Sequence, residues 1–221
     1  MRRTPPARTW RATFAVLGWA ALVLQYILMA GPAAPWDVLG QTINFFSFFT
    51  ILTNVLVALA FTGPLLDGQR WIARWSASEG VRAAVAMYIV VVAAVYHFML
   101  APFWRPEGLA FAVNVVLHYV MPAAFVIDWL AFAPKGRLRW VDPVKWLAFP
   151  LIYAAWTLAH GLATHWWPYG FVNVDELGLP RVVAIFAGML VFFLVVGLGL
   201  VGLDRMFGRP ARDTEAGATE F

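Results

Sequence analysis

The sequence places three histidines in stretches that are otherwise almost entirely apolar. They are His97, His118 and His160, and a fourth, His165, follows at the edge of such a stretch. Imidazole is the side chain that most readily exchanges a proton near neutral pH, and it also ligates haem iron. Because an ionisable group is costly to place in an apolar run, these positions are the first candidates for chemistry.

Hydroxyl and amide side chains accompany these histidines at helical spacing. Ser47, Thr50 and Asn54 are separated by three and four residues, which puts them on one face of a helix. Asn114 and His118 are four residues apart and share a face of another helix. The two faces together predict a polar pocket.

A proline follows His118 at the same helical spacing. In an α-helix the ring of Pro122 removes the amide donor of the His118 carbonyl and kinks the helix. Such a distortion is tolerated in a membrane where protein or water satisfies the carbonyl, which favours a pocket here. Asp128, further along the same stretch, is expected to pair with Lys135 or Arg137.

The composition requires these helices to lie in a membrane. Of the 221 residues, 62% are apolar and 13% are charged, and the mean hydropathy is +0.73. A soluble domain averages about 45–50% apolar and about 25% charged residues. These values exclude an ordinary soluble domain, a disordered chain and a nucleic-acid-binding module. Because the sequence has no cysteine, disulfides, iron–sulfur clusters, thiolate zinc sites and a cysteine nucleophile are excluded as well.

The apolar residues fall into stretches long enough to span a bilayer, for which about 20 residues are needed. Proline and glycine separate these stretches. The predicted spans are 13–30, 43–65, 83–103, 109–132, 146–166 and 182–203. We therefore predict an all-α, polytopic membrane protein with six transmembrane helices. Residues 1–12 would form a cytoplasmic N-terminus, 13–203 the transmembrane domain, and 204–221 a disordered cytoplasmic tail.

Lysine and arginine set the predicted orientation. Of the 16 basic residues, all but Arg105 and Arg181 lie in the terminal segments and in alternate connections. The positive-inside rule then puts both termini in the cytoplasm, which requires an even number of spans. Cleavage of the first span as a signal peptide is the alternative, and it would leave five spans. We expect a multi-pass protein of the cell membrane, here a bacterial plasma membrane.

This topology also predicts the depth of the candidate residues. Thr50 lies about 10 Å and His118 about 13 Å below the outer ends of their spans, at 1.5 Å per residue. His97 and His160 approach the same outer half from the opposite direction. A common depth favours one shared site over scattered packing contacts.

Three segments of the chain resemble a known family. They are residues 48–56, 114–129 and 153–171, which carry Thr50, His118 and His160 in that order. Their order and spacing resemble the bacterial branch of the androgen-induced gene 1 / FAR-17a-like membrane proteins. The resemblance covers the second to fifth predicted helices and agrees with a count of six.

The resemblance implies an intramembrane threonine hydrolase. Animal members of this family cleave fatty acid esters of hydroxy fatty acids with one threonine and one histidine, carried on two helices. These two correspond to Thr50 and His118 here. Thr50 would be the nucleophile, and His118 the base that takes its proton and then protonates the leaving alkoxide.

Further polar residues complete the expected site. Asn54, Asn114 or His160 could donate to the developing oxyanion, which is worth about 2.7–4 kcal/mol per donor. His97 and Ser47 are additional pocket candidates. No metal or cofactor is expected. Membrane lipids are the expected environment and substrate, nucleic acid is not an expected partner, and the sequence does not predict an oligomeric state.

Two other functions fit the same residues. Histidines on several helices could supply axial ligands to a haem in an electron-transfer membrane protein, although they do not form pairs at a repeated spacing. A transporter or a non-catalytic scaffold is the other alternative, although the chain has no detectable inverted repeat. A Soret band would identify haem, and labelling by a hydrolase probe would identify the enzyme.

Overall fold

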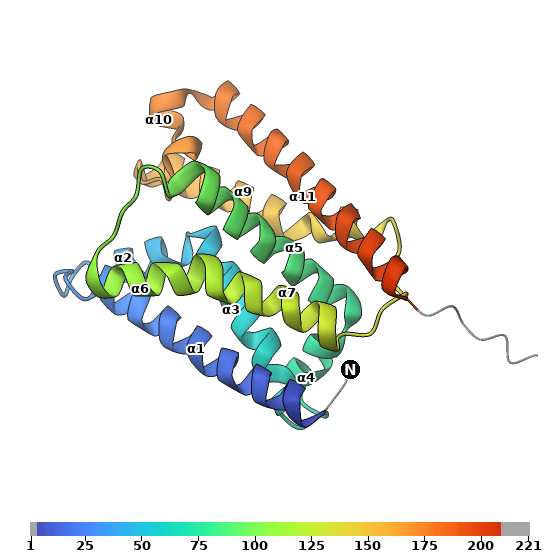
Figure 1. Cartoon of the computed structure of the whole chain (residues 1–221). Coiled ribbons are helices and arrows are strands. Elements are labelled where there is room, and N and C mark those ends of the chain that lie inside the picture. The colour runs from blue at the N-terminus through green and yellow to red at the C-terminus, as the bar shows by residue number, and fades with distance from the viewer. Residues whose placement is uncertain (1–3, 209–221) are drawn as a thin grey trace, which may run out of the picture.

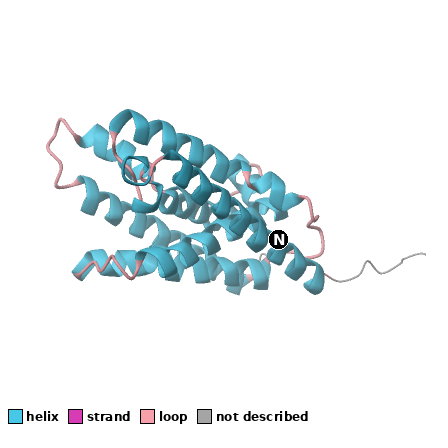
Figure 2. Ribbon diagram, turned by 90° about the horizontal axis from the view of Figure 1, so that it is seen from above, coloured by secondary structure: helices cyan, strands magenta, loops and turns pink. Residues whose placement is uncertain are grey.

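The protein is represented by a computed structural model, of which residues 4–208 are described (Figure 1, Figure 2). Within these residues the secondary structure is helical and contains no strand. In chain order the helical elements are α1 (Pro5–Ala30), α2 (Val38–Phe46), α3 (Phe49–Thr62), η1 (Gly63–Leu65), α4 (Trp71–Ala77), α5 (Glu79–Val95), η2 (Tyr96–Leu100), α6 (Gly108–Val115), η3 (Val116–Val120), α7 (Met121–Phe132), α8 (Asp142–Trp146), α9 (Ala148–Thr164), η4 (Gly170–Val172), α10 (Val174–Leu177) and α11 (Leu179–Phe207).

The long helices form a polytopic membrane bundle, as the composition predicts. Over the described residues, five helices are long and apolar enough to cross a membrane, and the bent pair α2–α3 makes six. Successive spans run in opposite directions, so the start of α1, α4 and the end of α11 gather at one end of the bundle (Figure 1). We call this the basic end, because its connections hold Arg70, Arg74, Arg137 and Arg139.

The first span extends further than the sequence predicts. α1 begins at Pro5, within the segment expected to precede the membrane, and proline is well suited to the first turn of a helix. Arg11 lies in the second turn and is buried inside the protein. Most of the predicted N-terminal segment 1–12 is therefore helix, and residues 1–3 lie outside the described residues.

The last span also continues beyond its predicted end at 203. Residues 204–207 form the last turn of α11 and not the start of a disordered tail. Asp204 is buried there, and its carboxylate accepts hydrogen bonds from the N–H groups of Gly136 and Leu138 (2.9 Å each). These bonds hold the end of α11 against the connection that follows α7. Residues 209–221 of the predicted tail lie outside the described residues.

The second span is broken where the sequence predicts one continuous helix. α2 and α3 meet at an angle of 73°. The Ser47 hydroxyl donates to the Ile43 carbonyl (2.8 Å) at the end of α2, and Phe48 has an extended backbone. Ser47 therefore belongs to a different helix from Thr50 and Asn54. The prediction of one face for all three was wrong, and only Thr50 and Asn54 share it.

The fourth span contains a π-helical turn just before Pro122. In η3 the N–H of Met121 donates to the carbonyl of Val116, five residues earlier. In that register, Pro122 leaves the Leu117 carbonyl without a backbone donor. The prediction of a freed His118 carbonyl assumed α-helical geometry, and the π turn moves the gap by one residue.

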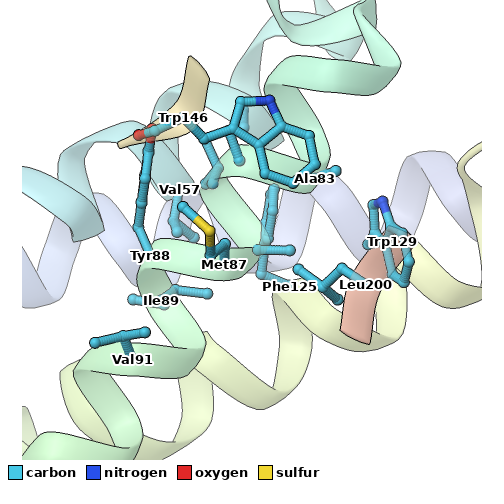
Figure 3. Packing of buried hydrophobic residues seen from close by; sticks show 14 of the residues in the cluster. Val57, Ala83, Met87, Tyr88, Ile89, Val91, Phe125, Trp129, Trp146 and Leu200 are labelled. Atoms are coloured by element: carbon cyan, nitrogen blue, oxygen red, sulfur yellow. The ribbon is translucent and has the colours of Figure 1, made fainter. Parts of the chain in front are cut away.

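α5 is the central helix of the bundle. In its apolar window 56% of the residues are buried inside the protein, against 17% for α11. Met87 and Ile89 of α5 pack in the same cluster as Val57 of α3 and Phe125 of α7 (Figure 3). Lipid tails are as apolar as these side chains, so the hydrophobic effect does not drive the helices together. Helix association in the membrane therefore depends on such close packing.

A buried ionic cluster joins α1, α5 and α7 at the basic end. Asp128 accepts a hydrogen bond from Nε of Arg11 (2.8 Å) and forms an ion pair with Arg82. All three side chains are 2% exposed or less. The prediction that Asp128 pairs with Lys135 or Arg137 was wrong, because two neighbouring helices bring arginines to it instead.

Candidate functional site

A cavity of about 60 Å³ lies at the break in the second span. It is surrounded by α3, α5, η2, α9, η4 and α11. The lining is apolar apart from four side chains with hydroxyl groups, Thr50, Tyr96, Tyr153 and Tyr169. A cavity with several polar groups and this volume can hold ordered water.

Thr50 sits in the first turn of α3, directly beside the cavity. Its hydroxyl lies 3.4 Å from the hydroxyl of Tyr169, and its backbone N–H donates to the same oxygen (3.4 Å). The first N–H groups of a helix have no intrahelical acceptor and carry partial positive charge. The break therefore places the partial positive charge of a helix N-terminus next to the Thr50 hydroxyl, within the span.

Four other threonines in the bundle are arranged differently, whereas the buried hydroxyls of Thr53 and Thr157 have no hydrogen-bond partner among the described residues. Thr9, Thr42, Thr62 and Thr164 each donate to the carbonyl four residues earlier, at 2.7–3.2 Å. This is the ordinary structural role of threonine in a membrane helix. Among the described residues the Thr50 hydroxyl has Tyr169 as its hydrogen-bond partner and makes no bond of this kind. The extended residue before α3 removes the preceding turn that would supply the carbonyl.

Tyr169 reaches the cavity from the segment between α9 and η4. Its ring stacks on Phe171 (ring centroids 5.1 Å apart) and meets Phe48 edge-on (5.6 Å). Burial raises the pKa of the Tyr169 phenol. The hydroxyl is therefore protonated near neutral pH and available as a hydrogen-bond donor.

Tyr153 supports the break itself. Its hydroxyl donates to the Ser47 carbonyl (3.1 Å), and the indole of Trp156 donates to the Ser47 hydroxyl (2.9 Å). Both residues belong to α9. The Ser47 carbonyl at the break is thus satisfied by protein, as a distortion within a membrane span requires.

Asn54 connects the start of α3 to the π-helical turn η3. Its side-chain amide donates to the Thr50 carbonyl (2.9 Å) and to the Leu117 carbonyl (3.2 Å). The second acceptor is the carbonyl that Pro122 leaves without a backbone donor. Asn54 is fully buried, and its Oδ1 has no hydrogen-bond partner among the described residues.

His118 follows Leu117 in η3. Its Nδ1 lies 3.0 Å from the Asn114 carbonyl, which can only accept, so Nδ1 carries the proton. In the neutral ring, Nε2 then holds the lone pair and can accept a proton. The structure gives no hydrogen bond between His118 and Thr50, both of which are described, and His118 is not among the residues that line the cavity.

Tyr96 lies at the contact between the cavity and His118. Its ring lines the cavity and stacks on the imidazole, with ring centroids 3.9 Å apart. The side-chain amide of Asn114 donates to the Tyr96 hydroxyl. Asn114 thus orients Tyr96 and does not face the Thr50 hydroxyl. Tyr96 also begins η2, so two π-helical turns meet here, and such turns are frequent at functional sites.

The remaining predicted site residues lie away from the cavity. His160 bonds to the Asn44 side chain (3.1 Å) and stacks on Trp156, so with Ser47 it joins α2 to α9. His97 is exposed, and its Nδ1 lies 3.1 Å from the hydroxyl of Tyr119. The structure therefore brings Thr50, Asn54 and His118 to one region and separates His160 and His97 from it.

A larger apolar groove adjoins the cavity on the outside of the bundle. It measures about 420 Å³ and lies between the α2–α3 pair and α9, where Phe46, Ile152 and Trp156 are exposed. Exposed apolar side chains on a spanning helix face lipid. Tyr153 lines both the groove and the cavity, so it is the wall between them.

Sequence reasoning gave no role to the three tyrosines of the cavity. Tyr153 and Tyr169 lie in the segment 153–171 that carries part of the family resemblance, and this was the available signal. Tyr96 lies outside the three segments of the family resemblance, and no feature of the sequence marked it as a site residue. A search for ionisable and amide groups passes over phenols, which are common as interfacial anchors in membrane proteins.

Comparisons with known proteins do not identify a family. No family model matches the chain, and no curated protein or solved structure is significantly similar to it. The resemblance to the androgen-induced gene 1 / FAR-17a-like proteins remains a prediction. Within residues 4–208, no group of three or more histidine, aspartate or glutamate side chains could hold a metal ion.

Proposed function

We propose that this protein is an integral membrane hydrolase that cleaves lipid esters, with Thr50 as the nucleophile and His118 as the general base. One observation carries the proposal. The Thr50 hydroxyl faces a cavity at the start of a helix that is broken inside the span, and it does not bond back to its own helix. The family resemblance adds the reaction type, and the basic end of the bundle would face the cytoplasm of a bacterial cell.

The surroundings of Thr50 suit attack on an ester carbonyl. The oxyanion that forms would lie within reach of two donors, the Thr50 N–H and the Tyr169 hydroxyl, which already meet at this point (3.4 Å). Donors that are fixed before the reaction stabilise charge as it develops, and a low-dielectric site makes them more effective. Neither donor was among the predicted oxyanion contacts.

His118 has the geometry of a base that is held by its other nitrogen. The Asn114 carbonyl fixes Nδ1–H, which leaves Nε2 to accept the Thr50 proton. Substrate binding would bring Nε2 to Thr50 directly or through one water molecule, since catalytic hydrogen bonds are often long before substrate binds. Asn54 holds the Thr50 turn against η3, which carries His118, and so limits the distance between Thr50 and His118 that substrate binding must close.

The reaction then proceeds in two halves. The Thr50 oxygen bonds to the carbonyl carbon as its proton moves to His118, and the tetrahedral intermediate expels an alkoxide that takes the same proton. Water attacks the acyl-threonine, His118 accepts one of its protons, and that proton returns to the Thr50 oxygen as the carboxylic acid leaves. The products are one alcohol and one acid, with no cofactor.

A lipid ester would enter from the bilayer. The groove between the α2–α3 pair and α9 offers an apolar surface for an acyl chain, and Tyr153 separates it from the cavity. The cavity alone, at about 60 Å³, is too small for such a substrate. Movement of Tyr153 would join the two spaces and bring an ester to Thr50.

The broken helix also favours a second candidate function. In transporters, the N-terminal end of a half-helix within the membrane binds the anionic group of a substrate. The start of α3 could hold the carboxylate of a fatty acid in the same way, without any reaction. A protein of this kind would bind the acid at Thr50 but would not turn over an ester.

A fluorophosphonate probe on the purified protein distinguishes the two. We expect labelling of the wild type and of Thr50→Ser, and none of Thr50→Val, which keeps the shape of threonine without the hydroxyl. Thr62→Val is the matched control, because that hydroxyl bonds back to the Ala58 carbonyl. Labelling that survives in Thr50→Val would overturn the proposal. Fatty acid binding without labelling or ester turnover would favour the second candidate.

A further inference from the structure

A second hollow, unrelated to Thr50, lies at the basic end. It measures about 260 Å³ and is formed by the start of α1 and the end of η1 with the turn that follows it. Figure 1 shows this end of α1 beside α4. The lining residues are Arg8, Arg11, Pro64, Leu65, Leu66 and Asp67. Because it lies where two spans end, it is at the depth of lipid headgroups.

The hollow has positive charge on one side. Arg11 lines it and belongs to the buried cluster with Asp128 and Arg82, in which two guanidinium groups share one carboxylate. Arg8 adds a second guanidinium at the mouth, where it is exposed.

The opposite side carries a negative charge. Asp67 is exposed, and one of its carboxylate oxygens accepts the N–H of Gln69 (3.2 Å). Within residues 4–208 neither Arg8 nor Asp67 forms an ion pair, with each other or with another residue. Two opposite charges thus face one hollow without neutralising each other directly.

We propose that this hollow binds the phosphoethanolamine headgroup of a phospholipid. Guanidinium groups bind phosphate through paired N–H donors, so the exposed Arg8 would hold the phosphate. A primary ammonium donates three hydrogen bonds, and Asp67 is the acceptor available for it. The side chains of Leu65 and Leu66 lie beside the hollow, where the glycerol and the first acyl carbons would pass.

The two charges select this headgroup over others. Choline carries a positive charge but no N–H, so it would lose the hydrogen bonds to Asp67. A phosphatidylglycerol headgroup has no cation, and Asp67 would then repel its phosphate. A charge-assisted hydrogen bond contributes enough to change affinity about tenfold. The expected order is therefore ethanolamine, then choline and glycerol lipids.

Native mass spectrometry of the full chain in detergent tests this order. Phosphatidylethanolamine, phosphatidylcholine and phosphatidylglycerol with identical acyl chains are added in turn, and bound lipid is counted. We expect about tenfold tighter binding of the ethanolamine lipid. Asp67→Asn should abolish that preference, and Arg8→Gln should weaken all three. Glu107→Gln and Arg70→Gln, also exposed, are controls that should change neither.

Three results would overturn the proposal. One is equal binding of the three lipids by the wild type, and another is an unchanged preference in Asp67→Asn. The third is displacement of the lipid by soluble phosphoethanolamine at equal concentration, which would make the free headgroup the ligand. All the substitutions are at exposed positions, and a melting curve for each variant identifies any that fail to fold.

Discussion

The side-chain amide of Asn54 donates to the backbone carbonyl of Leu117 (3.2 Å), which lies on a different span. Pro122 and the π-helical turn leave that carbonyl without a backbone donor. The same amide holds the Thr50 carbonyl at 2.9 Å. One side chain therefore ties the proposed nucleophile's turn to the turn that carries the proposed base.

Replacement of Asn54 by leucine should cost both stability and activity. The buried Leu117 carbonyl would lose its donor, which costs about 1–3 kcal/mol, and the Thr50 and His118 turns would no longer be held together. Thermal unfolding in detergent and ester turnover measure the two effects. Thr53→Val is the matched control, because that hydroxyl is fully buried and has no hydrogen-bond partner among the described residues. It should unfold at the wild-type temperature or higher, and an Asn54→Leu variant that behaves the same way would contradict the prediction.

This connection shows where sequence reasoning works and where it fails. The pairing of Thr50 with Asn54 on one helix face follows from local spacing, and the six spans follow from apolar length, so both were predictable. The break before Thr50 was not predictable in the same way. It depends on α9, whose Tyr153 and Trp156 satisfy Ser47 across more than 100 residues of sequence.

The register of η3 was unpredictable for a similar reason. Pro122 predicts that one carbonyl loses its donor, but local sequence does not distinguish an α-helical from a π-helical turn. A donor from another span, Asn54, satisfies the carbonyl that the π-helical turn leaves without a backbone donor. Likewise, charge near a predicted membrane boundary suggested neighbours in sequence for Asp128, whereas Arg11 and Arg82 reach it from two other helices.

Asp128→Asn should be severely destabilising. The substitution leaves Arg11 and Arg82 buried without the carboxylate between them, and removal of one member of a buried ionic group costs about 3–5 kcal/mol. The control variant is Glu79→Gln, which breaks the ion pair between Glu79 and Arg137 (3.4 Å). The Arg137 side chain is 78% exposed. A pair of that kind is worth about 0–1 kcal/mol. Chemical denaturation of the two variants gives the difference, and equal midpoints would be inconsistent with a buried charge network.

The segment between α9 and α11 should loosen in acid. The indole of Trp167 donates to Asp175 (2.8 Å), and His165 lies 3.2 Å from it; these contacts hold the pKa of the Asp175 carboxyl below its usual 3.8. A lowered folded-state pKa means that the contribution to stability is present above about pH 4 and is lost as the pH falls below it. Hydrogen exchange of residues 165–178, corrected for intrinsic rates, measures this. The wild type should be better protected than Asp175→Asn at pH 6, and this difference should shrink as the pH falls below about 4. A difference in protection that does not shrink below about pH 4 would assign the protection to other contacts.

Tyr169→Phe should separate catalysis from folding. The variant loses a hydroxyl that lies 3.4 Å from the Thr50 hydroxyl, a weak contact in the resting protein, but keeps the stacking on Phe171. If the phenol donates to the oxyanion, kcat falls about 10²–10³-fold while KM and the unfolding temperature change little. Tyr88→Phe is the control, because that phenol is buried in the core and donates to the Trp146 carbonyl (2.6 Å). It should lower the unfolding temperature and leave kcat of the folded protein close to wild type. Unchanged turnover in Tyr169→Phe would remove Tyr169 from the mechanism and leave the first N–H groups of α3 as the oxyanion donors.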